Sequence, residues 1–120
     1  MGIYSTKVIQ DDFVIPLHPT LIERMGLIYK ESYTVPSLPN VKVSFTDTVY
    51  VTVTFQRVSH VLVMQKLQEG AETDLFTSKV DEYGQIQLPE PLMDEMKWEV
   101  RDHVRIYRID NNMAIIRLEE

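Results

Sequence analysis

The sequence predicts a mainly β protein with two short helices. The strongest signal is residues 48–55, a run of β-branched and aromatic side chains of the kind enriched in strands. Polar and apolar residues alternate through 41–45 and 85–88, which is the period of a half-buried strand. Leucine and methionine lie one helical turn apart in two places, at 21 and 25 and at 92 and 96, which predicts a short helix around each pair.

The first 35 residues resemble the last 44, which indicates an internal repeat. Residues 5–8 match 77–80, and Ile15-Pro16 echoes Leu88-Pro89. Beyond these the offset is constant at 71, in the pairs Leu21–Leu92, Met25–Met96, Leu27–Trp98, Glu31–Asp102, Tyr33–Val104 and Val35–Ile106. We therefore expect a first copy in residues 1–67, a polar linker in 68–76 and a second copy in 77–120.

The middle of the chain differs most from the repeat. Two prolines exclude a helix from 35–40, since each removes a donor and biases its neighbour toward extended backbone. We expect strands at 41–45 and 48–55 around a turn at Thr46-Asp47, and then a strand, or a strand leading into a helix, over 58–67. Residues 36–66 are thus either the lengthened closing hairpin of the first copy or an inserted three-stranded sheet.

The second copy has a clearer pattern. A strand ends at 79–80, and the turn 81–84 contains Gly84, which is free to take positive φ. The strand 85–88 is stopped by Pro89, and Glu90-Pro91 suits the first turn of a helix. Two further strands, 104–109 and 113–118, flank the turn sequence 110–112.

This pattern resembles the AbrB-type swapped-hairpin superfamily (SpoVT-AbrB-like), which includes transition-state regulators, MazE-like antitoxins and the tandem MraZ proteins. The residues that carry the resemblance are Lys79, Val80, Asp81, Gly84, Ile86, Leu88, Pro89, Leu92, Met96, Trp98, Asp102, Val104 and Ile106. The resemblance implies a tandem swapped-hairpin (double-split) β-barrel that closes within one chain, with Asp81 ordering the turn. The first copy departs from it at residues 10–12, which lack the turn glycine.

The resemblance also implies a function, namely a DNA-binding transcriptional regulator. The DNA-facing positions of the family correspond to Lys7, Arg24, Lys79 and Gln85, repeated by homo-oligomerisation. However, Gln85, Met93 and Asp94 stand where regulators carry arginine, and the net charge is −6. Because DNA affinity depends on neutralised phosphates, the alternative is a protein-interaction or assembly module, or an antitoxin-like protein, that has lost DNA binding.

Other classes of function have little support in the sequence. The histidines at 18, 60 and 103 are too far apart for a metal site and cysteine is absent, so we expect no metal and no other cofactor. The paired acids at 11–12, 81–82 and 94–95 suit turns and helix surfaces, and no phosphate loop or nucleophile motif occurs, so we expect no enzyme. Neither a membrane-spanning run of roughly 20 apolar residues nor a signal peptide is present, which favours a cytoplasmic protein.

Overall fold

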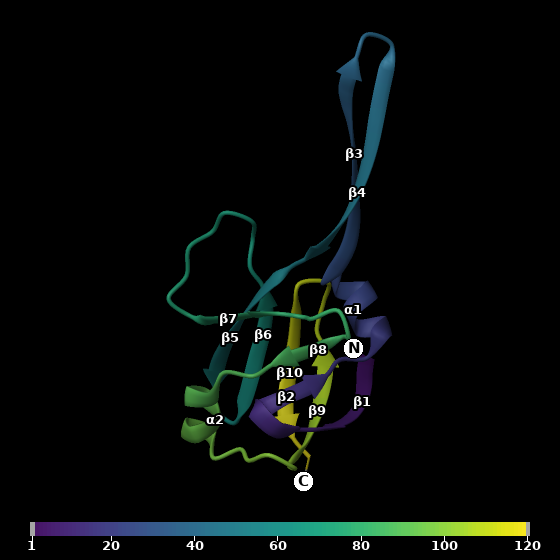
Figure 1. Ribbon diagram of the computed structural model, residues 1–120. Helices are drawn as coiled ribbons and strands as arrows, with labels where there is room; N and C mark the ends of the chain where they lie inside the picture. The colour runs from purple at the N-terminus through teal and green to yellow at the C-terminus, as the bar shows by residue number, and fades with distance from the viewer. Residues whose placement is uncertain (1, 120) are drawn as a thin grey trace.

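The computed structural model describes residues 2–119, with the side chains of 6–35 and 39–119. It is mainly β with two α-helices, as the sequence predicts (Figure 1). In chain order the elements are β1 (Gly2–Val8), the 3-10 helix η1 (Asp11–Phe13), β2 (Val14–Pro16), α1 (Pro19–Met25), β3 (Ile28–Leu38), β4 (Val41–Tyr50), β5 (Thr52–Val58), β6 (Val61–Lys66), β7 (Phe76–Lys79), β8 (Gln85–Gln87), α2 (Glu90–Met96), β9 (His103–Arg108) and β10 (Met113–Leu118).

Six strands form one antiparallel sheet in the order β1-β9-β10-β6-β5-β7. The first strand of each half of the chain lies at an edge and pairs with a strand from the other half, β1 with β9 and β7 with β5. At the centre, β10 of the second half pairs with β6 of the first. The strand order is therefore symmetric: β1, β9 and β10 on one side correspond to β7, β5 and β6 on the other. Each half of the chain contributes an edge strand that pairs with the hairpin of the other half.

The small sheet β2-β8 follows the same symmetry. Its central pair is Ile15 with Ile86, two residues that are 71 positions apart. The same offset relates the turns that support it: Leu17 donates its backbone N–H to the carbonyl of Gly84, and Leu88 donates to that of Phe13, both at 2.8 Å. Gly84 has φ +77 and Phe13 has φ +58, so Phe13 takes the left-handed conformation where the second half has glycine.

The two helices end alike. Gly26 and Lys97, again 71 positions apart, are the left-handed C-caps of α1 and α2, with φ +62 and +61. The next residue in each half, Leu27 or Trp98, is buried and donates its N–H back into its own helix. The Gly84 turn of the second half lies against Ile22 of α1, while η1 of the first half packs on α2. The exchange between halves therefore includes the turns as well as the strands.

One hydrophobic core joins both halves. It lies between the inner face of the six-stranded sheet, the β2-β8 pair and the two helices. Its buried members include Ile9, Ile15, Leu21, Met25, Leu27, Val53, Phe55, Leu62, Met64, Ile86, Leu88, Met93, Trp98, Val104, Ile106 and Ile116. Because neither half supplies a complete set of these residues, the halves fold as one unit.

The strands β3 and β4 leave this body as a two-stranded arm (Figure 1). The arm lengthens the molecule to 63 Å, against 29 and 28 Å in the other two directions. The internal repeat shows where the arm is inserted. Residues before the arm correspond to residues of the second half at an offset of 71. After the arm the offset is 51, because Val53 and Phe55 occupy the places of Val104 and Ile106. The arm thus corresponds to twenty extra residues between α1 and the closing hairpin.

The structure differs from the sequence prediction in this region. The turn predicted at Thr46-Asp47 is wrong, because both residues are paired within β4. The strand predicted over 48–55 is two strands that break at Val51. The protruding segment is 28–50 rather than 36–66, and Tyr33 and Val35 lie in the arm, not in the positions of Val104 and Ile106. Alternation of polar and apolar residues is identical in an exposed ribbon and a barrel strand, so it could not separate the two.

Candidate functional site

The predicted DNA contacts are spread over four elements of the body. Lys7 is on β1 and Lys79 is on β7, the two edge strands of the six-stranded sheet. Arg24 is exposed in the last turn of α1, and Gln85 is half-buried on β8 opposite Pro16. Within residues 2–119, no hydrogen bond or ion pair joins any two of these four side chains.

The three predicted turn residues have structural positions. The Asp81 side chain accepts hydrogen bonds from the backbone N–H groups of Tyr83 at 2.8 Å and Gln85 at 3.0 Å. This is the pattern by which an aspartate orders a tight turn. A Cβ on Gly84 would lie 3.3 Å from Ile22 Cδ1, and Pro89 is the N-cap residue of α2. These residues hold the second-half turn between its strand and the helix of the first half.

Exposed apolar side chains gather on one face of the arm. Directly opposite residues of β3 and β4 share a face, and on one face these pairs are Tyr29 with Val49, Tyr33 with Phe45, and Val35 with Val43. The exposed fraction is 45% for Tyr29, 46% for Tyr33 and 45% for Phe45, and the rings of Tyr33 and Phe45 stack with centroids 5.3 Å apart. We call this the apolar arm face; its exposed members are Tyr29, Tyr33, Val35, Val41, Val43 and Phe45.

Two carboxylates interrupt this face. Glu31 and Asp47 are opposite each other, between the Tyr29 and Tyr33 rows. The Asp47 charge, and to a smaller degree that of Glu31, raises the pKa of the Tyr33 phenol above its ordinary value. Neither carboxylate forms a salt bridge with another residue of the described chain. The face is therefore apolar at its ends and negative in the middle.

The other face of the arm is polar. Hydroxyl groups pair across the strands, Ser32 with Thr46 at 3.2 Å and Thr34 with Ser44 at 3.3 Å. Lys30 and Lys42 also lie on this face, which follows from the alternation along each strand. Each cross-strand hydroxyl pair stabilises the ribbon by roughly 0.2–1 kcal/mol, whereas a two-stranded hairpin by itself is only marginally stable in water.

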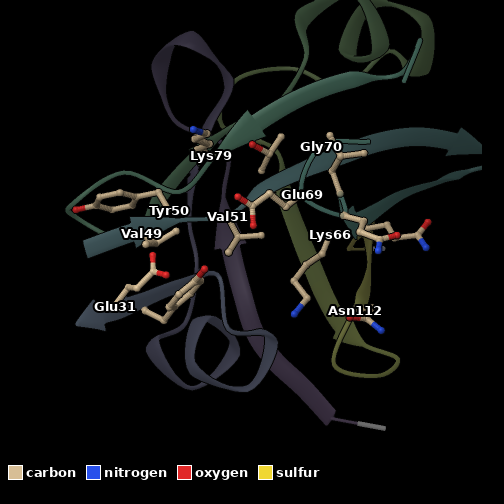
Figure 2. A pocket seen from close by; sticks show the side chains of 14 residues that line it. Glu31, Val49, Tyr50, Val51, Lys66, Glu69, Gly70, Lys79 and Asn112 are labelled. Carbon is tan, nitrogen blue, oxygen red and sulfur yellow. The ribbon is translucent and has the colours of Figure 1, made fainter. Parts of the chain in front are cut away.

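A cavity of about 860 Å³ lies where the arm meets the body. Figure 2 shows Glu31, Val49 and Tyr50 on one side and Lys66, Gly70 and Asn112 on the other. Lys79 also lines it, whereas Lys7, Arg24 and Gln85 do not. The cavity is continuous with the apolar arm face and reaches the body. The two cations that line it are Lys66 and Lys79.

A second cavity, of about 670 Å³, lies between the β5–β6 turn, α2 and the end of β10. We call it the α2 groove, and it is lined by Arg57, Val58, Ser59, His60, Val61, Met96, Trp98, Arg117 and Leu118. Arg57 pairs with Glu95 at 3.2 Å, while exposed Arg117 has no salt bridge among residues 2–119. Val58 is 49% exposed. The groove therefore combines apolar side chains with an unpaired cation.

No cluster of three or more histidine or acidic residues that could hold a metal ion occurs in the part of the chain that the structure describes. No helix between residues 2 and 119 has the length and apolar character needed to cross a membrane.

Sequence reasoning missed both the apolar arm face and the α2 groove. The alternation that builds the arm face is visible in residues 29–35 and 41–49, but it reads equally well as a core-facing pattern. The groove joins residues 57–61, 96–98 and 117–118, which only the fold brings together. Comparison with protein-family models, curated proteins and solved structures finds no match to this chain.

Proposed function

We propose that the chain is a non-enzymatic assembly module in which the β3–β4 arm of one copy docks onto another copy. The observation that supports this most directly is the apolar arm face. Its six exposed apolar residues present roughly 400–500 Å² of apolar surface in total, on both sides of Glu31 and Asp47, and exposed apolar patches of this order are often functional. An arm with two unpaired strand edges and an uncovered apolar face is prone to aggregation unless a binding surface covers it.

Docking of the arm would also use the geometry of the body. The six-stranded sheet, with its own core, holds the arm at one end of an elongated molecule. A rigid base of this kind lowers the entropic cost of presenting the arm to a partner. The proposed interface therefore needs no reorganisation of the body.

Photo-crosslinking can test this proposal. We expect a benzoylphenylalanine at Val43, on the apolar arm face, to give an adduct of twice the chain mass. The same group at Ser44, one residue away on the polar face, serves as the matched control and should give several-fold less. Mass spectrometry of the irradiated purified protein measures both. Monomer alone at both positions, up to millimolar concentration, would contradict the assembly function.

A DNA-binding transcriptional regulator is the second candidate. The two halves exchange edge strands, which is the arrangement that the AbrB-type resemblance implies. This observation supports DNA binding as the second candidate function. The absence of cysteine suits a reducing compartment such as the cytosol. Against DNA binding stands the net charge of −6.

Salt dependence distinguishes the two candidates. If the chain binds DNA, log K for a random duplex falls steeply with log salt, and Lys79→Glu abolishes binding without lowering the melting temperature. For the assembly module we expect no duplex binding by fluorescence anisotropy even at about 50 mM salt. Lys97→Glu, an exposed lysine at the end of α2, is the control for charge reversal outside the predicted surface.

A further inference from the structure

We infer that the acceptor for the arm is the α2 groove of a second copy, so that copies join head to tail. This inference rests on the proposed assembly function and adds the identity of the site that receives the arm. It is carried by the complementarity of two surfaces at separate places on the same chain.

The arm face cannot pair well with a second arm face. Two such faces brought together would bury four carboxylates, Glu31 and Asp47 from each copy, and the strands of the arm add no cation to this face; Lys66 and Lys79 belong to the body, at the cavity beside the base of the arm. The lysines of the arm, Lys30 and Lys42, lie on the opposite face. Burying an unpaired charge costs several kcal/mol per ion, which exceeds what a small apolar contact returns. Symmetric arm-to-arm docking is therefore disfavoured.

The α2 groove supplies what the arm face lacks. Arg117 lies at its edge, exposed and without a salt bridge in the described chain, and Arg57 lies nearby with only the exposed partner Glu95. A guanidinium can bind a carboxylate through two parallel hydrogen bonds. We assign Arg117 to the pair Glu31 and Asp47 of the incoming arm.

The apolar parts of the two surfaces also match. The groove offers the exposed Val58 and the partly buried Met96 and Leu118 over the buried Trp98, and the arm offers the stacked Tyr33 and Phe45 rings. The groove, with a volume of about 670 Å³, has room for side chains of an incoming arm. Buried aromatic anchors beside a charge pair are the usual composition of an interface hot spot.

Position in the molecule makes the contact intermolecular. The arm extends from the body at the end away from α2 and the β5–β6 turn (Figure 1). A chain's own arm therefore points away from its own groove. A contact between two different surfaces of identical chains is heterologous, and it propagates from copy to copy as a ring or a filament.

Charge reversal with rescue by mixing tests the assignment. The first variant, Glu31→Arg with Asp47→Arg, makes the arm face positive while keeping like charges opposite each other, as in the native arm. The second variant, Arg117→Glu, reverses the groove. We expect each variant alone to assemble at least about tenfold more weakly than the native chain, measured by sedimentation velocity over a concentration series. Arg24→Glu, at an exposed arginine of α1 that lines neither cavity, is the control and should assemble normally.

The mixture gives the decisive result. In an equimolar mixture every arm meets a groove of opposite charge, so we expect the two variants to restore assembly together, in alternation. Unchanged melting temperatures would show that both remain folded. If the native chain assembles but neither variant weakens it, or if mixing fails to restore it, the groove assignment is overturned while the assembly function stands. A native chain that stays monomeric overturns both.

Discussion

Replacing residues 28–51 by the sequence of residues 99–102 is expected to remove the arm and leave the body folded. The reason is the internal symmetry: Leu27 and Thr52 occupy the places of Trp98 and His103, which the second half joins with only residues 99–102. The short loop has a conformation adapted to this span, with Arg101 at φ +83 and its N–H bonded to Ile9 O at 2.7 Å. Val80, which is buried like Ile9, is available to do the same in the first half.

Two measurements check this armless variant. Its melting temperature should stay within about 8 °C of the native value, which corresponds to roughly 1 kcal/mol for a domain of this size, because Ile28 is the arm residue packed against the core. Its assembly in sedimentation velocity should be abolished. An armless chain that fails to fold would show that the halves are not related as described, and one that still assembles would remove the arm from the interface.

Phe55→Ala is expected to have the largest effect on stability. Phe55 is 1% exposed in the core, and truncating a buried phenylalanine costs about 3–5 kcal/mol through lost burial and the cavity left behind. Since small domains are stable by only about 5–15 kcal/mol, this variant should unfold at much lower denaturant concentration. Urea denaturation followed by circular dichroism measures the change.

Phe45→Ala is the matched control for Phe55→Ala. The substitution is chemically identical, but Phe45 is 45% exposed on the arm and stacks on Tyr33. We expect the free energy of unfolding of the body to change by less than about 1 kcal/mol, while assembly weakens. Equal destabilisation by the two variants would mean that Phe45 is buried as fully as Phe55, which would contradict an exposed arm face.

Much of the body was predictable from local sequence. The helices around Leu21 and Leu92, the turn at Gly84 and the hairpin 104–118 follow from short-range patterns, and these elements are present. The offset of 71 relates structurally equivalent residues of the two halves up to the pair Leu27 and Trp98. It failed beyond them because Tyr33 and Val35 resemble Val104 and Ile106 in polarity, although the first two lie in solvent-exposed strands.

The candidate surfaces were less predictable for a physical reason. Whether an alternating strand such as 41–49 faces a core or solvent depends on which strand pairs with it, and pairing is a long-range property. Phe13 gives a second example. A phenylalanine in the sequence does not predict a left-handed turn. Phe13 nevertheless has φ +58, because the exchanged turn and strand surround it. Arg117 became a candidate only when the fold placed it beside Trp98.

The arm occurs in only one of the two halves. A barrel made from two identical chains would display two arms related by a twofold axis, and each unit could then make contacts in opposite directions. With both halves in one polypeptide, the extra segment occurs once, so each molecule has one arm. A head-to-tail assembly of such molecules would have a direction, because the arm and the α2 groove are different surfaces of the same chain.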